Sequence, residues 1–198
     1  MNNESIHNPA AKTRGILFSR PMAQAIRDGR KTQTRRLIRA SRDVTPTHPR
    51  GSWCYVKETI YIVPPGEAII AGMPVHLRTD PSTRIARHVL YAADLSPSSI
   101  NLLRRSGWRA TPSMTMPRWA ARHWLHITSA YLERLHDIPP ADAIAEGITM
   151  PPASAPGGPV GAYRSLWCAL HGQPSWDTNP TVWVYTFTVH TQPGTTTT

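Results

Sequence analysis

The sequence predicts an α+β domain in which helices flank an antiparallel, barrel-like sheet. The clearest strand is the stretch TVWVYTFTV, residues 181–189, where Trp183, Tyr185 and Phe187 alternate with smaller side chains at the period of two that a strand imposes. Strand-like and helix-like stretches follow one another without regular βαβ repetition, and the chain contains no internal repeat. Both observations favour a mixed, antiparallel architecture over a doubly wound sheet.

The chain has 198 residues, which is enough for one domain with a buried core, and we expect that domain to cover residues 14–190. Residues 1–13 are polar and unpatterned, and residues 191–198 have the low-complexity sequence TQPGTTTT. Both ends are therefore predicted to be disordered tails.

A short apolar run and a capped amphipathic stretch predict the first two elements. GILFS, residues 15–19, is typical of a strand. Ser19 can then cap a helix that has Pro21 in its first turn and ends at Gly29.

Hydrophobic period and turn residues predict the remaining elements. Residues 53–62, WCYVKETIYI, are rich in β-branched and aromatic side chains that alternate between two faces. Asp137 can cap a later helix that ends at Gly147, which places Glu146 in the last turn. The predicted strands in this part of the chain are 53–62, 87–93 and 124–134, and the predicted helices are 95–106, 136–148 and 162–172.

The charge balance favours a polyanionic partner. The chain has 22 Lys and Arg against 12 Asp and Glu, a net charge of +10 and a pI near 10.4, and such a charge attracts nucleic acid or acidic membrane surfaces. A GC-rich genome is the alternative explanation, since it enriches Arg without any ligand. Only Lys12, Lys31 and Lys57 among the cations are lysines, and lysine, unlike arginine, can lose its proton.

Two isolated cysteines and the polar N-terminus predict the compartment. Cys54 and Cys168 show neither the spacing of a disulfide framework nor that of a zinc ribbon, which favours a reducing cytoplasm. No apolar leader segment is present and no stretch approaches 18 apolar residues, so we expect a soluble, cytoplasmic protein with no membrane contact.

Cofactor and metal chemistry are not predicted. The pair His123 and His126 lies beside a predicted strand, where residues three apart point to opposite faces, and the cysteine and carboxylate partners of a metal site are missing. The sequence also has no glycine-rich phosphate loop, nucleophile elbow or paired catalytic carboxylates. We therefore expect no metal and no cofactor.

Tryptophans beside arginines suggest a stacking surface. Trp108 and Trp119 lie near Arg118 and Arg122, a combination that can stack on nucleobases. Simple packing of these rings in the core is an equally favoured interpretation.

The stretch GRKTQTRR, residues 29–36, has two interpretations. The simpler one is a phosphate clamp made by Arg30, Arg35 and Arg36. The other makes Lys31 a base and Thr34 a nucleophile, because neighbouring positive charge favours a neutral amine that can take the hydroxyl proton. Residues three apart on a strand face opposite ways, so this pair requires Lys31 to lie in the turn before the strand.

Several segments together resemble the bacteriophage and prophage branch of the ASCH proteins, whose β-barrel is similar to the PUA domain. The resemblance covers about residues 15–190 and is carried by GRKTQTRR, WCYVKET, MPRWAAR, ERLHDIPPADAIAEGI and NPTVWVYTFTV.

The resemblance implies a small barrel with a positively charged cleft, in a superfamily associated with RNA and modified nucleobases. Some small members are amidohydrolases that deacetylate N4-acetylcytidine and have a G-R-K-T-x-T-x-R motif, which this chain matches from Gly29 to Arg36. By that likeness Lys31 would be the base, Thr34 the nucleophile, and Glu146 would orient or protonate. This chain is far longer than those enzymes, and its additional segments 63–86, 94–112 and 149–162 could close over the cleft or block it.

The sequence thus predicts a catalytic set and a binding set for a partner that is RNA, a modified nucleoside or DNA. The catalytic set is Lys31, Thr34 and Glu146. The binding set is Arg30, Thr32, Arg35, Arg36, Lys57, Glu58, Trp108, Arg118, Trp119 and Arg122. The alternatives are a ribonuclease, a non-catalytic binder of RNA or modified DNA, and a phage protein that occupies a host nucleic-acid-binding site.

Overall fold

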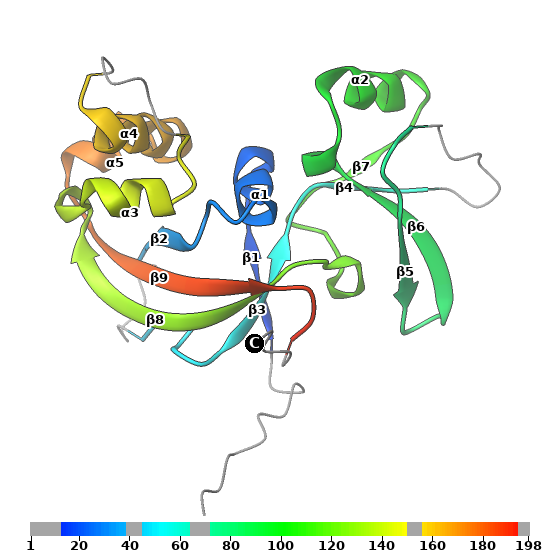
Figure 1. The fold of residues 1–198 in the computed structure, drawn as a ribbon, viewed down its shortest axis with the longest axis horizontal. Helices are drawn as coiled ribbons and strands as arrows, with labels where there is room; N and C mark the ends of the chain where they lie inside the picture. Colours follow the sequence, from blue (N-terminus) through cyan, green and yellow to red (C-terminus); the bar gives the residue numbers. More distant parts are fainter. Residues whose placement is uncertain (1–12, 39–44, 64–71, 150–155, 194–198) are drawn as a thin grey trace, which may run out of the picture.

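The computed structural model describes residues 13–38, 45–63, 72–149 and 156–193. These residues form the predicted α+β fold, but with two sheets where the sequence predicts one (Figure 1). Most of each predicted tail, residues 1–12 and 194–198, lies outside the described residues.

The main sheet has five strands in the order β1-β3-β8-β9-β2. Every neighbouring pair is antiparallel except β1 with β3, which is parallel. Because β1 and β2 are its two edges, the described residues form an open sheet and no closed barrel. The strands are β1 (Arg14–Leu17), β2 (Gln33–Leu37), β3 (Trp53–Lys57), β8 (Trp124–Arg134) and β9 (Thr181–His190).

A second sheet is inserted between β3 and β8 and lies on the right in Figure 1. The predicted strand at 53–62 is therefore wrong as a single element: Glu58 and Thr59 separate β3 from β4, and the two strands belong to different sheets. A strand at 76–80, which the sequence did not predict, lies within the additional segment 63–86. In the order of hydrogen bonding, the strands are β5 (His76–Asp80), β6 (Ile85–Tyr91), β4 (Ile60–Ile62) and β7 (Ala110–Thr111).

In the described ranges of the chain, five α-helices flank the sheets. In Figure 1, α3, α4 and α5 gather over one end of the main sheet, while α2 lies with the second sheet. The α-helices are α1 (Arg20–Arg27), α2 (Pro97–Arg105), α3 (Pro140–Ala145), α4 (Gly158–His171) and α5 (Gln173–Asp177). Short 3-10 helices are η1 (Ala92–Asp94), η2 (Arg118–Ala120) and η3 (Leu135–Asp137).

Two helix predictions need correction. The predicted helix at 136–148 is interrupted, because Ile138 and Pro139 separate η3 from α3, and a residue before proline disfavours helical backbone. A helix that the sequence did not predict, α5, follows α4, and its Trp176 is buried against Tyr163 and Trp167 of α4. None of the described helices is long and apolar enough to cross a membrane.

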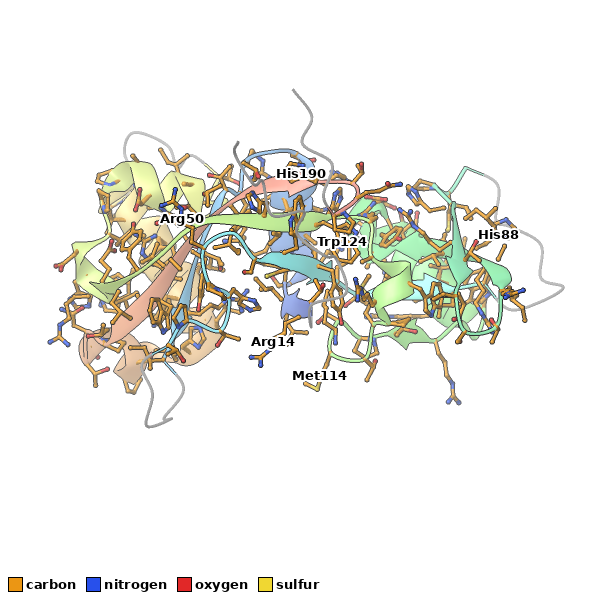
Figure 2. All side chains as sticks on the ribbon, turned by 90° about the horizontal axis from the view of Figure 1, so that it is seen from below. Arg14, Arg50, His88, Met114, Trp124 and His190 are labelled. Atoms are coloured by element: carbon orange, nitrogen blue, oxygen red, sulfur yellow. The ribbon has the colours of Figure 1, made fainter. Side chains whose placement is uncertain are left out.

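Separate clusters of apolar side chains stabilise the parts of the molecule. Met22 and Ile26 of α1 pack on the main sheet, and Tyr163 and Trp167 of α4 pack with residues at the start of β9 and in η3. Trp124, labelled in Figure 2, joins a cluster that connects the main sheet to the second sheet. The space between α1 and α4 is left for a cavity.

Candidate functional site

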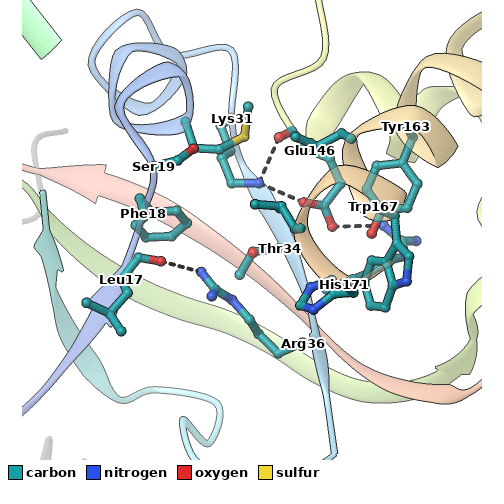
Figure 3. Close-up of a pocket in the computed structure, with 14 residues that line it drawn as sticks. Leu17, Phe18, Ser19, Lys31, Thr34, Arg36, Glu146, Tyr163, Trp167 and His171 are labelled. Carbon is teal, nitrogen blue, oxygen red and sulfur yellow. Dashed lines mark hydrogen bonds and ion pairs between the residues drawn. The ribbon is translucent and has the colours of Figure 1, made fainter. Parts of the chain in front are cut away.

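A cavity of about 200 Å³ lies between α1, β2 and α4. Lys31, Thr34 and Glu146, the three predicted catalytic residues, all line it (Figure 3). The rest of its wall is mainly apolar and aromatic and includes Phe18, Met22, Tyr163, Leu166, Trp167 and His171.

Lys31 is held in the connection between α1 and β2. Gly29 has a φ of +72°, which lets the chain reverse after the helix, and the Lys31 N–H donates to the Ala25 carbonyl over 3.0 Å. Lys31 then forms an isolated antiparallel bridge with Glu146, before β2 begins at Gln33. The condition set by the sequence is met: Lys31 precedes the strand that carries Thr34, and both side chains line one cavity.

Glu146 is the C-terminal cap of α3 and only 3% exposed. Lys31 Nζ donates to Glu146 Oε2 over 2.7 Å and to the Glu146 backbone carbonyl over 2.7 Å. On the other carboxylate oxygen, Glu146 accepts a longer contact of 3.4 Å from Arg35 Nη1. The carboxylate therefore fixes the position of the lysine amine.

The surroundings of Lys31 favour its neutral form. Burial lowers the pKa of Lys31, the Glu146 carboxylate opposes this, and the positive charges of Arg36 and Arg35 lower the pKa further. The predicted effect of Arg35 and Arg36 is thus present, but burial is the largest cause.

Tyr163 contributes a hydroxyl on the far side of Glu146. Figure 3 shows the Tyr163 side chain pointing toward the Glu146 carboxylate. Burial and the negative charge of Glu146 raise the pKa of Tyr163, so the phenol remains protonated and can donate a hydrogen bond.

Gly147 allows the close approach of Lys31 to Glu146. Its φ is +89°, and a methyl group there would lie 2.8 Å from Ala25 Cβ and 2.9 Å from Lys31 Cβ. We expect Gly147→Ala to lower the free energy of unfolding by about 2 kcal/mol or more, because backbone strain and a clash add. Urea denaturation measures this.

Gly29→Ala is the matched control. Gly29 also has a positive φ, but a methyl group there would meet nothing within 4 Å. Its cost should be limited to backbone strain, about 1 kcal/mol. Equal losses in the two variants would contradict the packing argument for Gly147.

The three predicted arginines of residues 29–36 have different surroundings. Arg35 is fully buried and pairs with Glu133 (2.9 Å) and Asp142 (2.8 Å), so its charge is already neutralised by the protein. Arg30 contacts the Gly147 carbonyl outside the cavity, and Thr32 is exposed and absent from the cavity wall. Arg35 and Arg36 both line the cavity, and Arg36 donates to the Leu17 carbonyl over 2.8 Å.

The structure places the other predicted binding residues away from this cavity. Glu58 and Arg122 form a buried ion pair at 2.9 Å, and Trp108 lies in the core of the second sheet. None of the six residues in this group lines the cavity: Lys57, Glu58, Trp108, Arg118, Trp119 and Arg122. Of the two interpretations of Trp108, core packing is the one observed.

Sequence analysis did not assign the α4 residues to the site. Tyr163, Trp167 and His171 are spaced by four residues and so share one helix face, which was a signal for the position of this wall. An apolar stripe on a helix does not show which part of it borders a cavity, so the sequence does not predict this wall.

Neither a metal-binding group among the described residues nor a match to a known protein helps to identify the site. Among the described residues, no group of three or more His, Cys, Asp or Glu side chains is placed to hold a metal ion. Comparisons with protein-family models, with curated proteins and with solved structures find no match for this chain.

Proposed function

We propose that the cavity takes an N-acylated nucleobase of the N4-acetylcytidine type and that the protein, acting in the cytoplasm, hydrolyses its acyl amide. The observation that carries this proposal is that Lys31, Thr34 and Glu146 line one cavity, with Lys31 ion-paired to Glu146 at 2.7 Å. A buried lysine with a lowered pKa is suited to act as a general base.

The size of the cavity supports a small substrate group. Its volume of about 200 Å³ is below the range of about 300 to 1,000 Å³ that is typical for drug-sized ligands. Aromatic walls from Phe18, Tyr163 and Trp167 are suited to a flat ring. A single base with its acyl group therefore fits the proposal better than a nucleic-acid segment.

The proposed reaction begins with attack of Thr34 Oγ1 on the acyl carbon, while neutral Lys31 Nζ takes the hydroxyl proton. Collapse of the tetrahedral intermediate breaks the C–N bond, and the Lys31 ammonium returns its proton to the leaving nitrogen. Water then attacks the Thr34 ester and gives a proton to Lys31, which passes it to Thr34 as the acid departs. Glu146 holds the amine in place and balances its charge when it is protonated.

We also propose that the fold is of the PUA-like, ASCH type. The five-stranded antiparallel-rich sheet, α1 between β1 and β2, and the order of the quoted motifs support this. Leu17 of edge strand β1 and Arg36 of edge strand β2 are joined by a hydrogen bond, as expected where a barrel is nearly closed.

The direct test incubates the protein with N4-acetylcytidine and follows the release of cytidine and acetate. Wild type should turn over the substrate, and Lys31→Ala should not. Equal inactivity of the two proteins would refute the amidohydrolase.

Substitutions of Thr34 distinguish a nucleophilic role of this residue from a role in substrate binding alone. Thr34→Val removes the hydroxyl at nearly constant shape and should lower kcat at least about 10³-fold, whereas Thr34→Ser should retain measurable activity and form a serine ester. Steady-state assays and mass spectrometry of the acylated protein measure both effects. Activity in Thr34→Val close to that of wild type would exclude Thr34 as the nucleophile.

The pH profile tests Lys31. Only the neutral amine accepts a proton, so kcat/KM should rise with pH and level off above the pKa of Lys31, which burial places below the usual lysine value. A profile that falls over the same interval would contradict a lysine base.

A non-catalytic reader of RNA or modified DNA is the second candidate. Arg84 and Arg109, exposed beside strands β6 and β7 of the second sheet, make no ion pair among the described residues, and they suit a phosphate backbone. Nucleic-acid affinity that weakens with salt, together with no turnover of N4-acetylcytidine, would favour this candidate.

A further inference from the structure

A second cavity of about 340 Å³ adjoins the first between the two edge strands of the main sheet. Leu17 of β1 and Arg36 of β2 line both cavities, so the hydrogen bond between them marks the boundary. Other residues of its wall include Arg14, Thr45, Thr47, His48, Trp183 and Tyr185.

Among the described residues, the second cavity has an uncompensated positive charge. Arg14 and Arg36 line it, none of the described carboxylates does, and Arg14 makes no ion pair within the described part of the chain. Figure 2 shows the Arg14 side chain extending outward from the ribbon. The first cavity differs, because the charge of Lys31 is balanced there by Glu146.

Arg36 has a donor left over for a ligand. Its Nη2 is bound to the Leu17 carbonyl, but its Nε is buried and has no hydrogen-bond partner in the described structure. A buried donor without a partner costs free energy that an anion at this position would recover. Arg30 lines neither cavity, and Arg35 lines the first cavity but is paired with carboxylates. Arg36 is thus the one arginine of residues 29–36 that lines a cavity without a carboxylate partner among the described residues.

The two arginines of the second cavity affect the protonation of His48. Burial and the positive charges of Arg36 and Arg14 lower the pKa of His48 to about 4, so its ring is neutral near pH 7. The wall thus offers two guanidinium groups, threonine hydroxyls and a neutral imidazole, a set of donors that is typical of an anion site.

We propose that the second cavity binds the phosphate of a nucleotide whose base occupies the first cavity. The preferred substrate would then be a phosphorylated nucleoside, or a nucleotide within a strand, which binds more tightly than the free nucleoside. This inference takes from the proposed function only that the first cavity holds a nucleobase.

Binding of unacylated probes tests the inference without requiring catalysis. Calorimetry would compare cytidine, its 5′- and 3′-monophosphates, a short oligocytidylate and inorganic pyrophosphate. The proteins are wild type, Arg14→Gln and the control Arg104→Gln, which makes the same change of charge on exposed α2, outside both cavities.

Wild type should bind one monophosphate about tenfold more tightly than cytidine and should also bind pyrophosphate. Arg14→Gln should lose most of this preference, and Arg104→Gln should keep it. An oligocytidylate that binds more tightly than either monophosphate identifies a strand as the source of the phosphate, and one that does not identifies a mononucleotide.

Three results would overturn the inference: no phosphorylated probe binds, cytidine binds as tightly as its monophosphates, or Arg14→Gln and Arg104→Gln change the affinity equally. The acyl hydrolysis assay is scored separately. Turnover without a phosphate preference rejects this inference and keeps the proposed function, whereas an Arg14-dependent preference without turnover does the reverse.

Discussion

Lys31→Met is expected to lower the free energy of unfolding by about 3 to 5 kcal/mol, because it leaves the Glu146 carboxylate buried without its main partner. The same change should lower acyl hydrolysis by at least about 10²-fold, since the general base is lost. Urea denaturation and the N4-acetylcytidine assay measure the two effects. The amine is 2% exposed, so water cannot take its place at low cost.

The double variant Lys31→Met, Glu146→Gln separates stability from chemistry. Removing both charges of a buried pair is often nearly neutral, so the double variant should recover most of the lost stability. It should remain inactive, because no base is restored. Recovery of activity along with stability would show that Lys31 only holds the fold.

Arg122→Met is the second substitution with a large expected effect, about 3 to 5 kcal/mol of unfolding free energy. Arg122 donates to both carboxylate oxygens of Glu58, at 2.9 and 3.1 Å, and its guanidinium lies 3.9 Å from the ring centre of Tyr91. It also pairs with Asp94. These contacts connect the two sheets, so thermal or urea unfolding should show the loss.

The loss of stability in Arg122→Met should depend on pH in a defined direction. Burial already raises the pKa of Glu58, and removing Arg122 takes away the opposing effect. A carboxyl that binds its proton more tightly in the folded protein stabilises that state as pH falls, so the deficit relative to wild type should shrink from pH 7 toward pH 5.

Arg118→Met is the control for Arg122. Arg118 is exposed and makes no ion pair in the described residues, although its guanidinium lies 5.3 Å from the Trp124 ring. Its loss should change stability by about 0.5 kcal/mol or less. Similar losses for the two arginines would contradict a structural role specific to Arg122.

Residue type and hydrophobic pattern predict the long strands of this fold. β8 begins and ends at the predicted residues, and β9 differs by one residue, because runs of aromatic and β-branched side chains favour strands. The same pattern fails at 53–62, where alternation continues through Glu58 and Thr59 although the chain passes from one sheet to the other. The hydrophobic period shows which residues share one face of a strand, but it does not show which neighbouring strand that strand pairs with.

The local motif and the tertiary contacts contribute differently to the site. Residues 29–36 by themselves identify Lys31 and Thr34, because a lysine among arginines next to a hydroxyl is chemically unusual. The role of each arginine depends on contacts far along the chain: Arg35 meets Glu133 and Asp142, whereas Arg36 faces the cavities.

The sequence by itself determined the α+β class, most helices and strands, and the residues around Lys31, since these follow from period, turn residues and local chemistry. Only the tertiary structure decided that Glu146 pairs with Lys31, that Arg122 is buried, and that two cavities meet at Arg36. The reason is physical: burial and ion pairing depend on groups far apart in the sequence, with separations of 64 residues for Glu58 and Arg122 and 115 for Lys31 and Glu146. Local spacing has no information about such contacts.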